Sequence, residues 1–167
     1  VFFTHPTKKH YLMDISRTIG VAHTSVKKNL NELVRLGLIV ESVEKKGDRN
    51  FPLYWANRGN RLFKAHKTIY NISALFESKL IDFLEEKLTP KSLVLFGSYQ
   101  RGEDSEESDL DLFVECEREE VDLSPFEKKL GRKIELHFNK SFKSYPNELK
   151  NNIINGLVLS GFLEGFG

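Results

Sequence analysis

The chain has 167 residues, of which 40% are hydrophobic and 29% are charged, with a formal net charge of +1. No apolar run approaches the roughly 20 residues of a membrane span, and no cleavable signal pattern opens the chain, so we expect a cytoplasmic protein without a membrane partner. Cys116 is the one cysteine, which excludes intrachain disulfides and cysteine-based zinc sites.

The charge is divided unevenly along the chain. Residues 1–66 carry 12 Lys and Arg against 5 Asp and Glu, a net charge of +7, whereas residues 67–167 carry 13 against 19, a net charge of −6. A basic part can bind nucleic acid, while an acidic part would need cations to do so. We therefore expect a domain over residues 1–66, a linking helix over 67–90 and a second domain over 91–167.

The first part of the chain predicts two helices joined by a short turn. Apolar residues repeat at helical spacing from Leu12 to Ile19 and stop at Gly20, and Val21 to His23 form the turn. A second helix is expected to begin at Thr24 or Ser25 and to end at Gly37. Its expected buried face consists of Val26, Leu30, Leu33 and Leu36. This pattern is typical of a helix-turn-helix.

A hairpin with a basic tip is predicted next. Leu38–Val43 and Phe51–Trp55 have strand character and flank the tip Lys45–Asn50. The whole segment resembles the winged helix domains of prokaryotic regulators, in which the second helix enters a DNA groove and the hairpin contacts phosphates. By that resemblance the nucleic-acid-binding residues are Thr24, Ser25, Lys27, Lys28 and Asn31 on the helix and Lys45, Lys46 and Arg49 on the wing. Such domains also serve for homodimerisation or protein docking, and these alternatives stay open.

One or two helices are expected over Asn57–Leu88, ending before Thr89–Pro90. A buried strand, Leu93–Phe96, then leads to Gly97-Ser98, which can open a helical turn. The free N–H groups of such a turn, with a small hydroxyl beside them, favour an anion.

Two aspartates follow at strand spacing. Asp109 and Asp111 alternate with the apolar residues of Leu110–Val114, so they are expected on one face of a strand, where they can bind one hard cation. A solvated strand face is the alternative interpretation. We expect the segment before these aspartates, Glu103–Glu107, to form an acidic and mobile loop.

The remaining chain predicts a helix over Ser124–Leu130, a strand over Ile134–Phe138, a helix over Leu149–Ile154 and a short strand over Leu157–Leu159. In the first of these strands Glu135 points away from the apolar side chains. His137 shares the Glu135 face and could touch substrate, but we expect it to be exposed or hydrogen-bonded.

Three short motifs occur in sequence, namely Gly97-Ser98, Arg101-Gly102 and Ser108-Asp109-Leu110-Asp111. Together they resemble the signature of the DNA polymerase beta-like nucleotidyltransferase superfamily, in particular its minimal nucleotidyltransferases. The resemblance implies an α+β fold, a winged helix-turn-helix followed by a mixed β-sheet with packed helices, in a combination that looks like archaeal proteins.

The resemblance also implies the roles of the site residues. Asp109 and Asp111 would bridge two Mg²⁺ or Mn²⁺ ions, and Glu135 would hold the catalytic ion and accept the proton of the acceptor. Three such carboxylates repel one another unless a cation lies between them, and their oxygens suit these two metals. The nucleotide-binding residues would be Gly97, Ser98, Arg101 and Ser108.

The expected reaction is metal-dependent transfer of a nucleoside monophosphate from a nucleoside triphosphate, with ATP as the expected donor, to a hydroxyl group of a protein or nucleic-acid acceptor. One alternative is a DNA-binding regulator or antitoxin that uses the nucleotidyltransferase fold as a nucleotide sensor or partner scaffold. Another is an enzyme that adds nucleotides to RNA held by the winged helix.

Overall fold

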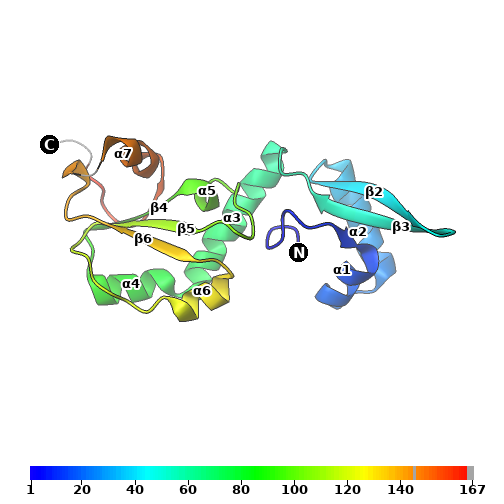
Figure 1. Ribbon diagram of the computed structural model, residues 1–167, viewed down its shortest axis with the longest axis horizontal. Helices are drawn as coiled ribbons and strands as arrows, with labels where there is room; N and C mark the ends of the chain where they lie inside the picture. The colour runs from blue at the N-terminus through cyan, green and yellow to red at the C-terminus, as the bar shows by residue number, and fades with distance from the viewer. Residues whose placement is uncertain (145, 165–167) are drawn as a thin grey trace. The chain divides into compact units, whose positions relative to one another are not determined.

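A computed structural model describes residues 1–144 and 146–164 of the chain (Figure 1). The chain forms two compact units, Val1–Lys67 and Thr68–Gly167. None of the helices in the described residues is long and apolar enough to cross a membrane.

The first unit contains a small three-stranded sheet and two helices. Its elements are β1 (His10–Tyr11), α1 (Leu12–Ile19), α2 (His23–Arg35), β2 (Ile39–Lys46) and β3 (Arg49–Ala56). The strand order is β1-β3-β2, and both pairs are antiparallel. A core of Ile15, Val26, Leu30, Ile39 and Tyr54 joins the helices to the sheet.

Helix α1 has the predicted bounds and is followed by Gly20 as expected, whereas α2 differs at both ends. Helix α2 begins at His23, one residue before Thr24, and ends at Arg35, before Gly37. Leu36, which we expected on the buried face of this helix, is 45% exposed.

The hairpin is tighter than predicted. A two-residue turn, Gly47-Asp48, replaces the expected basic tip, and Lys46 pairs with Arg49 in the strand register. Gly47 has a φ of 60°, which a tight hairpin turn requires. Lys45 therefore belongs to a paired strand, not to a loop. Lys46 Nζ also lies 3.0 Å from Glu44 Oε2, so part of its charge is neutralised within the hairpin.

The second unit is built on a four-stranded mixed sheet. Helix α3 (Arg61–Ser78) begins in the first unit and continues into the second. The other elements of the second unit are α4 (Leu80–Leu88), β4 (Ser92–Phe96), α5 (Gly97–Gln100), β5 (Leu110–Val114), α6 (Ser124–Leu130), β6 (Ile134–Phe138), the 3₁₀ turn η1 (Phe142–Ser144), α7 (Asn147–Ile154) and β7 (Leu157–Gly161). The strand order is β6-β5-β4-β7. Strands β5 and β6 are parallel, and the other two pairs are antiparallel. The helices and strands expected after residue 88 are confirmed.

Both faces of this sheet are covered. On one face α3, α4 and α6 pack against the leucines of β4 and β5 (Figure 1). On the other face Phe113 packs with Phe142 and with Ile153 of α7. Leu75 and Leu84 are fully buried in the first of these layers, so the segment that we expected to be a linking helix forms part of the core of the second unit.

A buried polar network fixes the loop between α5 and β5. Asp104 is 0% exposed, and its carboxylate accepts a 2.8 Å hydrogen bond from Asn71 Nδ2 and lies 3.3 Å from Arg132 Nη2. Asn71 Nδ2 also donates to the carbonyl of Tyr99. The prediction of a mobile acidic loop over Glu103–Glu107 is wrong in this respect, because a buried, paired carboxylate anchors that loop.

We expect Asp104→Ala to lower the free energy of unfolding by about 3–5 kcal/mol, because the buried Arg132 guanidinium loses a charged partner. Urea unfolding followed by circular dichroism measures the change. Glu103→Ala, which removes an exposed neighbouring carboxylate, is the matched control and should change stability little. Adding Arg132→Met to Asp104→Ala should recover part of the loss. A loss no greater than that of the control would contradict the anchoring role.

Candidate active site

The site is assembled where β4 ends and β5 begins. In the antiparallel register Phe96 pairs with Asp111, so Gly97 comes to lie against the Asp111 carboxylate. A Cβ atom at position 97 would collide with that carboxylate, and the φ of Gly97 is +78°. Position 97 therefore needs glycine for both its backbone conformation and its lack of a side chain.

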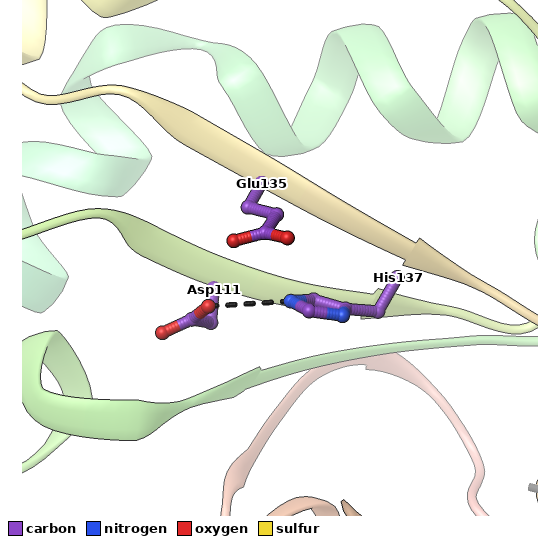
Figure 2. Close-up of side chains that lie close together, drawn as sticks. All are labelled: Asp111, Glu135 and His137. Carbon is purple, nitrogen blue, oxygen red and sulfur yellow. Dashed lines mark hydrogen bonds and ion pairs between the residues drawn. The ribbon is translucent and has the colours of Figure 1, made fainter.

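The parallel neighbour β6 adds two more polar side chains on the same face. Asp111 pairs with Glu135 in the register, and Phe113 pairs with His137. Ligand atoms of Asp111, Glu135 and His137 all lie within 4.8 Å of one another. Figure 2 shows the three side chains turned toward a common space beside the sheet. Glu135 is exposed while Ile134 is buried, as the strand pattern predicts.

His137 is held by Asp111. Its Nε2 lies 3.2 Å from Asp111 Oδ1, and the pKa of His137 is raised above its usual value, mainly by this hydrogen bond and further by the charge of Glu135. The ring packs against Phe96, with centroids 5.1 Å apart. We expected His137 to be exposed or hydrogen-bonded, and the hydrogen bond is confirmed. Sequence reasoning did not place His137 among the ligands, although its i, i+2 spacing from Glu135 was the available signal.

Asp109 is not one of these three residues. It is exposed and directly precedes β5, two residues before Asp111. It borders an open pocket of about 570 Å³ in the second unit. The pocket is lined by Glu106, Glu107, Ser108, Asp109, Glu127, Gly131, Arg132 and Lys133.

The predicted nucleotide-binding residues have different surroundings. Gly97 and Ser98 open helix α5, and Ser98 is half-buried. Arg101 is exposed, and its Nε lies 3.0 Å from Glu103 Oε2. Ser108 Oγ accepts a 2.9 Å hydrogen bond from the backbone N–H of Ser105, which closes the turn before Asp109.

The residues predicted to contact nucleic acid are all exposed. They are Thr24, Ser25, Lys27, Lys28 and Asn31 on α2 and Lys45, Lys46 and Arg49 on the hairpin. The apolar side of α2, with Val26 and Leu30, faces the core of the first unit, so the opposite side of the helix is polar and accessible.

Comparison with known proteins gives two matches. A model of the family described as "Nucleotidyltransferase domain" matches residues 77–159. A protein of Methanocaldococcus jannaschii named "Putative protein adenylyltransferase" is 40% identical over 83 residues, which cover 45% of this chain and 82% of that protein. No solved structure is significantly similar to the chain.

We expect Gly97→Ala to destabilise the second unit more than Gly131→Ala does. Both glycines have positive φ, +78° and +64°, so alanine costs about 1–2 kcal/mol in backbone strain at either position. Only at position 97 does the new methyl group meet the Asp111 carboxylate, which adds about 1–3 kcal/mol. Urea unfolding of both variants measures the difference. Equal losses would show that Asp111 moves aside freely.

In metal-free protein, Asp111→Asn should lower the pKa of His137, because the imidazolium loses the negative charge that stabilises it. Titration of the His137 ring signals by NMR in the presence of a chelator measures the shift. Asp109→Asn removes the same charge outside the cluster and should leave the His137 pKa unchanged. A shift of similar size in both variants would contradict Asp111 as the main cause of the raised His137 pKa.

Proposed function

Because the chain belongs to the nucleotidyltransferase domain family and is a nucleotidyltransferase enzyme, we propose that it transfers AMP from ATP to a hydroxyl group of a protein acceptor. The observation that carries the proposal is the pair of carboxylates, Asp111 and Glu135, that faces the turn at Gly97. The name of the M. jannaschii relative supports a protein as the acceptor and AMP as the transferred group.

The donor atoms at this site fit a divalent cation. Carboxylate oxygens of Asp111 and Glu135 lie within 4.8 Å of each other and repel unless a positive charge lies between them. Oxygen ligands suit Mg²⁺ or Mn²⁺. We propose that Asp111, Glu135 and, when nucleotide is bound, Asp109 hold such ions. When bound, the ions would neutralise the triphosphate and stabilise the leaving pyrophosphate.

The other residues would position the reactants. The turn at Gly97 and Ser98 would present backbone N–H groups to a phosphate, and Ser98 offers a hydroxyl next to them. Arg101 would need to leave Glu103 to contact a phosphate, and Ser108 holds the loop that presents Asp109. Glu135 is exposed, so an incoming acceptor hydroxyl can reach its carboxylate and transfer a proton to it.

We also propose that the first unit is a winged helix that binds duplex DNA. Support comes from the order strand, helix, helix, hairpin, from the exposed polar side of α2 and from the net charge of +7 over residues 1–66. This role is independent of the chemistry of the second unit, and each is tested separately.

Incubation of the full chain with ATP carrying a radioactive α-phosphate and with lysate from the source organism should label a protein. The label should survive nuclease and disappear with protease. Asp111→Asn and Glu135→Gln should each lower labelling by about 100-fold or more, because each removes a charge that holds the metal ions. Glu119→Gln, on an exposed connection, is the matched control.

A label that nuclease removes would identify a nucleic-acid acceptor and overturn the proposed protein acceptor. Binding of ATP and Mg²⁺ without any labelling, in wild type and control alike, would favour a nucleotide sensor.

For the first unit, the affinity for duplex DNA should fall steeply with salt, because phosphate contacts release counterions. Lys45→Ala combined with Arg49→Ala should flatten the slope of log K against log salt by up to about two. A fluorescence anisotropy titration at several salt concentrations measures it. As a control, Lys79→Ala at the N-cap of α4 with Lys87→Ala in its last turn removes the same charge from the second unit. No binding at low salt would indicate a protein-docking domain instead.

A further inference from the structure

His137 lies in the cluster with both carboxylates and is hydrogen-bonded to one of them, Asp111. It projects from β6 on the same side as Glu135, and its Nε2, not its Nδ1, is directed at Asp111 Oδ1 (Figure 2). A ring that presents Nε2 to a group of carboxylate oxygens can also present it to a cation bound by them.

The ring is fixed before any ligand binds. The parallel register places His137 beside Phe113, and the Phe96 ring lies 5.1 Å from the imidazole at an interplanar angle of 58°. The side chain of His137 is only 18% exposed. An imidazole held by packing in this way loses little conformational entropy when it binds a metal.

The donor atoms are close enough together for one ion to reach all three residues. Ligand atoms about 2.1 Å from a central ion lie about 3.0 Å apart when adjacent and about 4.2 Å apart when opposite. His137 Nε2 and Asp111 Oδ1 are 3.2 Å apart, and the whole set, with Glu135, spans no more than 4.8 Å. The three donors therefore need only small movements to bind one ion.

We propose that His137 is a nitrogen ligand of the cation held by Asp111 and Glu135, and that the site takes a first-row transition-metal ion such as Mn²⁺ in preference to Mg²⁺. The inference rests on the proposed function, in which these carboxylates bind metal. Mg²⁺ prefers oxygen ligands and retains its water, whereas imidazole is a good ligand for first-row transition metals. One imidazole among two carboxylates thus shifts the preference without removing the charge that binds the ion.

Mn²⁺ alone is the probe, because its unpaired electrons report directly on a bound nitrogen. The chain of residues 1–167, loaded with one equivalent of Mn²⁺, should show ¹⁴N modulation in electron spin-echo spectra. His137→Gln should abolish the modulation while Mn²⁺ still binds, and should reduce the ratio of the Mg²⁺ to the Mn²⁺ dissociation constants by about tenfold. His10→Gln, a partly buried histidine of the first unit, is the matched control and should retain the modulation.

A second measurement needs no substitution. Protein labelled with ¹⁵N only in histidine should show ¹⁵N in place of ¹⁴N modulation, which assigns the nitrogen to an imidazole even if His137→Gln fails to fold.

Bound Mn²⁺ without nitrogen modulation, or modulation that persists in folded His137→Gln, would overturn the role of His137 and leave the carboxylate site standing. Absence of Mn²⁺ binding to the wild type, with or without a non-hydrolysable ATP analogue, would overturn both the proposed metal site and this inference. Mn²⁺ binding that Asp111→Asn leaves unchanged would also overturn both the proposed metal site and the role of His137.

Discussion

The pairing of β4 with β5 is the constraint on which the site depends. Its antiparallel register brings the turn at Gly97 against Asp111, and the parallel addition of β6 then places Glu135 and His137 beside the same carboxylate. A shift of one residue in β5 would turn Asp111 into the leucine-rich layer and expose Leu112 on the site face. Burial on both faces of the sheet therefore specifies the geometry of the polar cluster.

Two buried carboxylates stabilise the loops around that sheet. Asp104 connects the loop before β5 to Asn71 and Arg132. Glu115, directly after β5, accepts a 2.8 Å hydrogen bond from Ser92 Oγ and a 3.1 Å bond from the backbone N–H of Phe142. A buried charge is tolerated only with such partners, so each carboxylate selects one loop arrangement. The cluster at Asp111 differs, because its carboxylates are accessible and can accept a cation.

The two units have opposite charge, and this division fits the roles proposed for them. The first unit, Val1–Lys67, carries a net charge of +8 and attracts polyanions directly. The second unit, Thr68–Gly167, carries a net charge of −7 and repels a triphosphate unless cations neutralise its carboxylates. Binding of ATP to the second unit is therefore coupled to the metal, and binding of DNA to the first is coupled to salt.

Local patterns in the sequence predicted much of the secondary structure and part of the candidate active site. Hydrophobic periodicity predicted most helices and strands, and the spacing of Gly97-Ser98 and Asp111 indicated the chemistry, because these features depend on neighbours in the chain. The sequence did not reveal that Asp104 is buried or that His137 joins the cluster. His137 bonds to Asp111, 26 residues earlier in the chain, and Asp104 bonds to Asn71, 33 residues earlier. Only strand register and helix packing, which depend on contacts distant in sequence, decided those positions.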